Sequence, residues 1–228
     1  MIEFLFLDLD DTILDFAQAE RVALAKTLAA FGVEPTEDRI VRYSQINKNC
    51  WKRMELGELT KDRLRTVRFE EFFAELGMQV DVEAVAKAYV EHLSVGHWFL
   101  PGAEEAVARL SKKYRLFLAS NGMASVQRGR MTSANLYRFF EQSFVSEEMG
   151  AAKPHRAYFD AAFARIEGFD PAKAIMVGDS LTSDIRGGIN AGIRTCWVNP
   201  GHKTRRADTV PDYEITALSQ LEALLETI

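Results

Sequence analysis

Residues 2–12 form a short apolar run that ends in a cluster of acids. Five of the six residues at positions 2–7 are apolar, which is typical of a strand buried on both faces of a parallel sheet. The run stops at Asp8, Asp10 and Asp11, three carboxylates within four positions. Carboxylates at the edge of a core repel one another and are costly to desolvate. Either these acids cap the next helix, or a cation sits among them.

The segment after the acids, residues 15–97, shows helical patterns without a strand signal. Thr36, Thr60 and Asp81 each stand ahead of apolar residues at helical spacing, as residues that cap helix N-termini do. Because this block interrupts the chain directly after the first strand, we expect residues 15–97 to form an inserted α-helical cap domain.

From residue 101 onward, helical and strand patterns alternate. Strands are expected near residues 115–119, 144–145, 174–177, 195–198 and 213–215, and one intervening helix is expected to run from Pro154 to Gly168. Strands that alternate with helices indicate a parallel sheet covered on both faces. The predicted fold is therefore α/β, with a Rossmann-like parallel sheet core made of residues 1–14 and 98–228.

Composition limits the classes of partner. The 228-residue chain has a net charge of −5, which argues against a nucleic acid polymer but permits a small phosphorylated ligand. No apolar run approaches the roughly 20 residues that cross a membrane, and the first run ends in acids, unlike a signal peptide. Cys50 and Cys196 are too few for a disulfide framework or a zinc site. We expect a cytoplasmic protein with reduced thiols, either a monomer or a homodimer.

Polar residues follow three of the expected strands. Asp8 and Asp10 follow the first strand, Ser120-Asn121-Gly122 the second, and Asp179 the third, with Asp184 five residues later; Lys153 stands just before the helix expected at Pro154. Taken singly, each has a bland reading as a turn, a helix cap or a surface charge. Ligands of open parallel sheets bind at the carboxyl ends of the strands, so the joint placement of these residues predicts a functional site there.

Four motifs stand in order along the chain: Asp8-Leu9-Asp10-Asp11-Thr12, Ser120-Asn121, Lys153-Pro154, and the segment from Gly178 to Asp184. With a helical block between the first two motifs, the sequence resembles the haloacid dehalogenase-like hydrolase superfamily over essentially its whole length. Asp15-Phe16 and residues 146–154 and 190–192 resemble, more narrowly, the branch of 5′-nucleotidases that act on noncanonical pyrimidine nucleotides.

The resemblance implies a role for each catalytic position. Asp8 would be the nucleophile that forms an aspartyl-phosphate, and Asp10 the general acid and base. Lys153 would pair with Asp8 and with the phosphate oxygens. Ser120 and the backbone N–H of Asn121 would bind a phosphoryl oxygen. Asp11 is expected to point away from the site, because Asp8 and Asp10 alternate with it along an extended segment.

The acids also require a cation. Two like charges ~4 Å apart repel by ~4 kcal/mol at an effective dielectric of 20, and one lysine cannot offset several such pairs plus a phosphate dianion. Mg²⁺ suits hard carboxylate and phosphate oxygens. The expected ligands are the Asp8 side chain, the Asp10 backbone carbonyl, Asp179, and Asp184 either directly or through water.

The expected cap domain would exclude water and select the leaving group. Asn47 and Trp51 are its candidate substrate-binding residues, with Arg68 and Phe16 as further candidates. An aromatic ring can stack on a base, but Trp51 equally fits a core position at helical spacing.

Taken together, the resemblance predicts an Mg²⁺-dependent phosphomonoesterase for a small phosphorylated metabolite, in particular a nucleoside 5′-monophosphate. A sugar-phosphate phosphatase or a phosphosugar mutase would share the same core and cap. A non-enzymatic ligand-binding protein is disfavoured because every proposed catalytic position is filled. A haloacid dehalogenase is disfavoured because that activity neither uses an acid at the Asp10 position nor requires magnesium.

Overall fold

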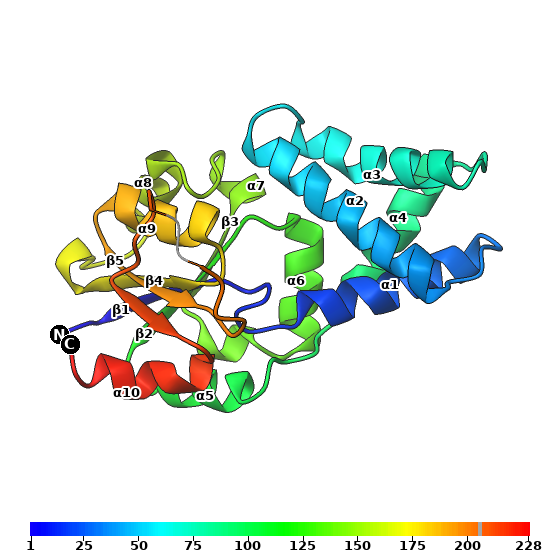
Figure 1. Ribbon diagram of the computed structural model, residues 1–228. Coiled ribbons are helices and arrows are strands. Elements are labelled where there is room, and N and C mark those ends of the chain that lie inside the picture. Colours follow the sequence, from blue (N-terminus) through cyan, green and yellow to red (C-terminus); the bar gives the residue numbers. More distant parts are fainter. Residues whose placement is uncertain (205–206) are drawn as a thin grey trace. The chain divides into compact units, whose positions relative to one another are not determined.

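In the computed structural model, which describes residues 1–204 and 207–228, six strands form one parallel sheet (Figure 1). The strands are β1 (Phe4–Leu7), β2 (Arg115–Ser120), β3 (Gln142–Val145), β4 (Ala174–Gly178), β5 (Arg194–Val198) and β6 (Tyr213–Ile215). Their order in the sheet is β3-β2-β1-β4-β5-β6, and every pairing is parallel. This is the strand order of a Rossmann sheet, so the predicted fold class is confirmed.

Helices cover both faces of the sheet, as Figure 1 shows. Their bounds are α5 (Ala103–Leu110), α6 (Ala124–Ser133), α7 (Ser146–Met149), α8 (Arg156–Phe163), α9 (Arg186–Ala191) and α10 (Leu221–Leu225). In β1, Leu5 and Leu7 pack in the cluster that includes α5 and α10, while Phe4 and Phe6 pack in the cluster that includes α8. Successive strand residues point to opposite faces, so an unbroken apolar run is what a sheet buried on both sides needs.

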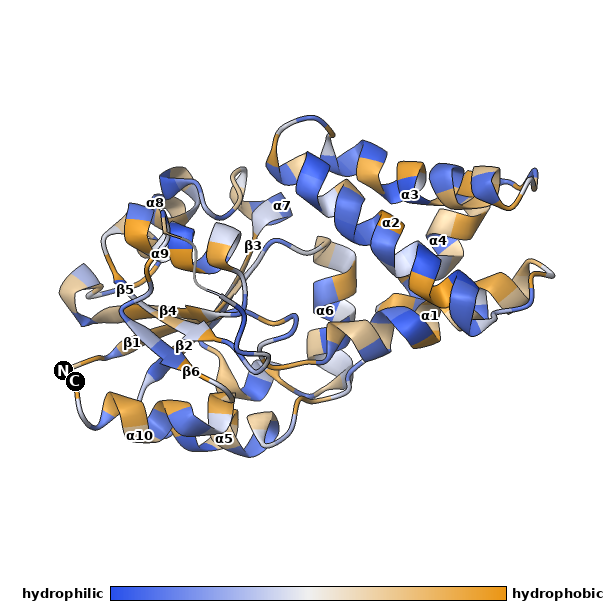
Figure 2. Cartoon of the chain, viewed as in Figure 1, coloured by the Kyte–Doolittle hydropathy of each residue, from blue (hydrophilic) through white to orange (hydrophobic). Residues whose placement is uncertain are grey.

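The chain divides into two compact units, one of residues 1–16 and 97–228 and one of residues 17–96. The second unit is helical, with α1 (Phe16–Ala30), α2 (Glu37–Glu55), α3 (Lys61–Glu75) and α4 (Val82–Leu93). Blue and orange segments alternate along α2 and α3 in Figure 2, as expected of helices that bury one side. Thr60 and Asp81 cap α3 and α4 through their side chains, whereas Thr36 precedes α2 without a side-chain cap.

The helix expected from Pro154 to Gly168 is shorter than predicted. It begins at Arg156 and ends at Phe163 as α8. The start was misplaced because Lys153 and Pro154 belong to a loop whose backbone is held by the side chain of Asn121. A tertiary contact here overrides the preference of proline for the first turn of a helix.

Among the residues that the structure describes, no helix combines the length and the apolar character needed to cross a bilayer. Cys50 and Cys196 are both free and buried. Burial raises the pKa of the Cys196 thiol to about 12, so this thiol stays protonated and unreactive at neutral pH.

Candidate active site

The carboxyl ends of three neighbouring strands carry the candidate site. Asp8 follows β1 directly, Ser120 is the last residue of β2, and Asp179 follows β4 directly. Because β1 lies between β2 and β4, the three residues emerge side by side at one edge of the sheet. The chain runs from β1 outward to β2 and β3, and then returns to β4 on the other side of β1. In sheets of this type, ligands bind outside the carboxyl ends of the strands at the point where the strand order reverses.

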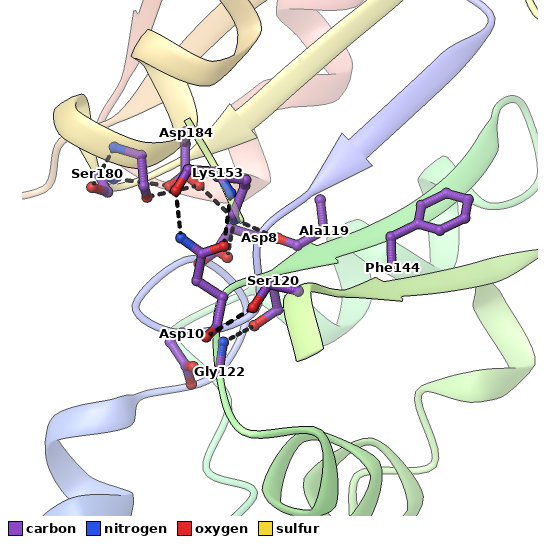
Figure 3. Close-up of polar contacts among 12 residues, drawn as sticks. Asp8, Asp10, Ala119, Ser120, Gly122, Phe144, Lys153, Ser180 and Asp184 are labelled. Atoms are coloured by element: carbon purple, nitrogen blue, oxygen red, sulfur yellow. Dashed lines mark hydrogen bonds and ion pairs between the residues drawn. The ribbon is translucent and has the colours of Figure 1, made fainter. Parts of the chain in front are cut away.

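Lys153 contacts residues that follow or belong to three different strands at this end of the sheet. Its Nζ lies 2.7 Å from Asp8 Oδ1 and 2.6 Å from Asp184 Oδ1, and it also donates to the carbonyl oxygen of Ala119 (Figure 3). An ammonium group has three hydrogens, so these three acceptors use its full donor capacity. Burial alone would lower the pKa of Lys153, but the carboxylates of Asp184 and Asp8 outweigh that effect and keep the amine charged.

The loop that carries Lys153 is fixed by the side chain of Asn121. The Asn121 Nδ2 donates to the Lys153 carbonyl oxygen at 2.8 Å, and the Asn121 Oδ1 accepts from the Lys153 backbone N–H at 2.9 Å. The amide side chain thus positions the lysine, and it leaves only the Asn121 backbone for the substrate contact expected from the sequence. That contact stays a prediction.

Ser120 lies beside the lysine cluster with its oxygen already engaged. The Ser120 Oγ accepts from the Gly122 backbone N–H at 3.1 Å and from Gln127 Nε2 at 2.8 Å. A hydroxyl that accepts two hydrogen bonds still has its own O–H to donate. Ser120 is therefore oriented to act as a donor, which is what a residue that binds a phosphoryl oxygen must be.

Asp8, Asp179 and Asp184 form a cluster with the chemistry of a magnesium site. One carboxylate oxygen from each lies within 4.8 Å of the others. Burial raises the pKa of Asp8 well above its usual value although Lys153 acts in the opposite direction, and burial with Asp184 raises the pKa of Asp179 to about 7. Burial is the main cause of both shifts, and the charges of neighbouring acids add to it. The set of hard oxygen donors with excess negative charge fits Mg²⁺.

Neighbouring residues hold the two later acids of this cluster in place. Trp197, which is buried in β5, donates from Nε1 to the Asp179 carbonyl oxygen at 2.8 Å. The Ser180 backbone N–H donates to Asp184 Oδ2 at 3.0 Å. Gly178 leaves room for the same carboxylate, since a Cβ on Gly178 would lie 2.2 Å from Asp184 Oδ2 and 2.4 Å from its Cγ.

The Gly178→Ala variant is therefore expected to lower Mg²⁺ affinity by ~10–100-fold, in the range typical when a partner that orients a metal ligand is lost. The added methyl group would displace Asp184, which cannot move without also losing its bond to Ser180. Isothermal titration calorimetry with MgCl₂ would measure the change. Gly201→Ala is the matched control, because its added Cβ would meet nothing nearer than Lys203 Cγ at 3.9 Å. Equal affinities in both variants would contradict this role of Gly178.

The side chains of Asp10 and Asp11 contact different parts of the structure. Asp11 adopts a left-handed backbone conformation with φ of 57°, and its Oδ1 accepts from the Phe16 backbone N–H at 3.0 Å. Asp11 thus stabilises the start of α1. The Asp10 carboxylate instead contacts Gln127 and Arg130 of α6. Neither α6 residue was identified from the sequence, although two polar side chains three positions apart share one helix face.

The cap candidates lie in the helical unit. Asn47 is fully buried, with Nδ2 donating to Glu20 Oε1 at 2.6 Å and Oδ1 accepting from Arg68 Nη1 at 3.1 Å. Arg68 is also buried, and its guanidinium lies over the ring of Tyr89 at 4.8 Å. Trp51 is half-buried. The structure therefore places Asn47 inside a network that bridges the charges of Glu20 and Arg68, whereas Trp51 is in part accessible.

The Asn47→Ala variant is expected to lower the free energy of unfolding by about 2–4 kcal/mol, because it would leave buried Glu20 and Arg68 without their bridge. Chemical denaturation would measure this loss. Asn49→Ala is the matched control, since Asn49 is exposed on the same helix, and a change within ~0.5 kcal/mol is expected there. If both variants were equally stable, the network would not be important for the fold.

Comparison with known proteins gives the family. Residues 5–198 match the family described as haloacid dehalogenase-like hydrolase. The chain belongs to this family. It is 36% identical to the putative HAD-hydrolase YfnB of Bacillus subtilis, over 97% of this chain and 94% of that protein. It is 37% identical to the pyrimidine 5′-nucleotidase PynA of Streptococcus pneumoniae, over 96% of this chain and 93% of that protein.

Solved structures agree with this assignment. A crystal structure of YfnB bound to magnesium superimposes with a TM-score of 0.94 at 36% identity, covering 98% of both chains. A 2-haloacid dehalogenase from Pseudomonas syringae superimposes with a TM-score of 0.68 at 29% identity, covering 100% of this chain and 99% of that one. The same fold thus occurs in relatives that bear the names of different activities.

Proposed function

We propose that this protein is a cytoplasmic, magnesium-dependent phosphomonoesterase that hydrolyses nucleoside 5′-monophosphates. The observation that carries the proposal is the contact of Lys153 with Asp8 beside Asp179 and Asp184. This group joins a carboxylate nucleophile, a fixed cation and a magnesium-binding acid cluster at one sheet edge. The name of PynA, and that of the E. coli pyrimidine 5′-nucleotidase YjjG at 30% identity, supports a nucleotide substrate.

The first chemical step is phosphoryl transfer to the protein. An oxygen of Asp8 forms a bond to phosphorus as the bond from phosphorus to the leaving oxygen breaks. The electron pair of that bond goes to the leaving oxygen, which takes the proton of the Asp10 carboxyl group. In the second step a water molecule attacks phosphorus and gives its proton back to Asp10. The bond between Asp8 and phosphorus then breaks, and its electron pair returns to the carboxylate.

The other residues of the site stabilise charge. The hydroxyl of Ser120 would donate to a phosphoryl oxygen, and Lys153 would do so in place of one of its three present acceptors. Interactions with such fixed donors become stronger as negative charge develops in a low-dielectric site. Mg²⁺ held by Asp8, the Asp10 backbone carbonyl, Asp179 and Asp184 would neutralise charge on the phosphoryl group. Trp51 remains the proposed contact of the cap with the nucleoside, and its half-buried ring suits stacking on a base. Asn47, the other candidate, is fully buried between Glu20 and Arg68 and is not offered as a contact.

A second candidate is a sugar-phosphate phosphatase or phosphosugar mutase with the same catalytic residues. The human N-acylneuraminate-9-phosphatase, 28% identical over the whole of this chain and 95% of that protein, favours the first of these. The likeness to a 2-haloacid dehalogenase raises another alternative. Against it stand Asp10, which a dehalogenase does not need, and an acid cluster suited to magnesium.

A phosphate-release assay over nucleoside 5′-monophosphates and sugar phosphates, with Mg²⁺ present, tests the proposal. Faster release from pyrimidine nucleotides than from any sugar phosphate is the expected result. Preference for a sugar phosphate would support the second candidate instead. Transfer of phosphate between sugar positions without its release would identify a mutase, and no phosphate chemistry at all would overturn both proposals.

A further inference from the structure

The Asp10 carboxylate is held on both of its oxygens by one helix. Its Oδ1 forms an ion pair with Arg130 Nη1, and its Oδ2 accepts from Gln127 Nε2 at 2.7 Å. The Arg130 and Gln127 side chains are buried, while the Asp10 side chain keeps 28% of its surface exposed. The partly exposed carboxylate of Asp10 is thus held by two hydrogen-bond donors that are themselves buried.

Gln127 also links Asp10 to Ser120. The same Nε2 that donates to Asp10 lies 2.8 Å from Ser120 Oγ, so its two hydrogens serve the two residues. The amide must present nitrogen to Asp10, because an ionised carboxylate only accepts hydrogen bonds. This one side chain therefore fixes the position of Asp10 relative to the residue proposed to bind a phosphoryl oxygen.

The loop after β2 is shaped around the Gln127 side chain. A Cβ on Gly122 would lie 2.2 Å from Gln127 Nε2, 2.6 Å from its Cδ and 2.8 Å from its Cγ. Moving only the end of the Gln127 side chain would not make room for this Cβ, because three successive atoms of the side chain lie close to it. Figure 3 shows Gly122, Ser120 and Asp10 close together at this end of the site. The absence of a side chain at position 122 thus preserves the link.

Arg130 is costly to bury, and its placement needs a reason. Removing a guanidinium from water is unfavourable unless an opposite charge and further contacts compensate. Asp10 supplies that charge, and the ring of Phe16 lies 5.8 Å from the guanidinium carbon. Arginine suits this role because its planar group stays charged and fixes the direction of a carboxylate.

We propose that Gln127 and Arg130 are positioning residues, which fix the direction of the Asp10 carboxyl group toward the leaving oxygen. Each Asp10 oxygen keeps a second lone pair beside the hydrogen bond it accepts, and this site carries the proton that Asp10 transfers. This inference rests on the proposed phosphatase function and deepens it. Both side chains contact Asp10, so they would act on the leaving group through this carboxyl group. They restrict the rotation of Asp10 so that the proton donor stays within reach of the leaving oxygen, and such orientation contributes strongly to catalysis.

The test compares two substrates that differ in their need for an acid. A nucleoside 5′-monophosphate releases an alkoxide oxygen, which must be protonated as it leaves. The 4-nitrophenyl ester releases a stable phenolate, which leaves without a proton. The value of kcat/KM reports phosphoryl transfer to Asp8, so its ratio between the two esters isolates the action of the acid from general damage to the site.

The variants are Gln127→Leu and Arg130→Met, with Arg128→Met as the matched control. Arg128 lies on the same helix and pairs with Glu148 on the surface. In the first two variants kcat/KM for the nucleotide is expected to fall by ~10²-fold, and for the aryl ester by less than ~5-fold, as loss of general acid catalysis predicts. The Arg128 variant should keep the natural ratio. Mg²⁺ affinity, measured by calorimetry, should be unchanged in all three.

Equal losses on both esters would overturn the positioning role, because a structural defect affects both substrates alike. Partial unfolding does not change the ratio of the two kcat/KM values, because it lowers the active fraction equally for both esters. If Arg130→Met does not fold, Gln127→Leu and Arg130→Lys give the same comparison. Hydrolysis of neither ester by the natural chain would overturn the proposed function and this inference with it. Hydrolysis of both by the natural chain, with unchanged ratios in the variants, would overturn this inference alone.

Discussion

The Asp8→Asn variant is expected to lose phosphate release by on the order of 10⁴-fold or more, the scale seen when a catalytic nucleophile is removed. An amide oxygen cannot form the proposed acyl phosphate, and the change also removes the carboxylate that pairs with Lys153 at 2.7 Å. Release of phosphate from 4-nitrophenyl phosphate with Mg²⁺, compared with the natural chain, measures the effect.

The matched control for this change is Asp160→Asn. Asp160 lies on α8 and pairs with Arg156 on the surface, so its loss should leave turnover within about twofold, as for most surface substitutions. The Asp8 variant is expected to remain folded, because it removes one of three mutually repelling carboxylates. Turnover of a folded Asp8→Asn protein at the natural rate would show that another group is the nucleophile.

Removal of divalent cations is the second change with a large expected effect. Excess chelator should lower phosphate release by at least ~10³-fold, and added MgCl₂ should restore it, as for a cation that stabilises several kcal/mol of transition-state charge. The reason is the charge of the site among the described residues, where the carboxylates of Asp8, Asp179 and Asp184 lie together and Lys153 pairs with two of them. Full activity in chelator would remove the metal from the mechanism.

The same acid cluster predicts how the metal-free protein responds to pH. Folding raises the pKa of Asp179 from 3.8 to about 7, so between these values the folded chain binds more protons than the unfolded chain. The contribution of Asp179 to stability therefore falls as pH rises through this range. Thermal unfolding in chelator should show the fall, and saturating Mg²⁺ should reverse it. A contribution of Asp179 to the stability of the metal-free protein that grows as pH rises would contradict the raised pKa of this carboxyl group.

Strand ends were the part of the site most accessible from the sequence. Asp8, Ser120 and Asp179 each follow or end a strand with a clear apolar pattern, and parallel strands bring such ends to one edge. The fold class follows from the same alternation of strands and helices. Lys153 was also identified, but only its motif indicated that a loop residue would reach Asp8 across the sheet edge.

Contacts made by buried polar residues were not accessible from the sequence. Gln127 and Arg130 lie on a helix where polar residues usually face solvent, and only the tertiary structure shows that they turn inward to Asp10. Asn47 presents the opposite case, since a polar residue expected near the substrate is enclosed by Glu20 and Arg68. Residue type and spacing indicate that a group is polar, whereas its partner depends on which elements pack together.

A single labelling experiment tests the central claim most directly. The natural chain, in excess over a nucleoside 5′-monophosphate and with Mg²⁺, would complete one turnover in water enriched in heavy oxygen. Mass spectrometry would then locate the label. The label is expected in the released phosphate, because water attacks the phosphorus atom of the intermediate on Asp8. Label in the Asp8 carboxylate would mean that water attacks the carboxyl carbon of Asp8, as expected when an alkyl ester of Asp8 is hydrolysed. That result would contradict the proposed phosphatase mechanism.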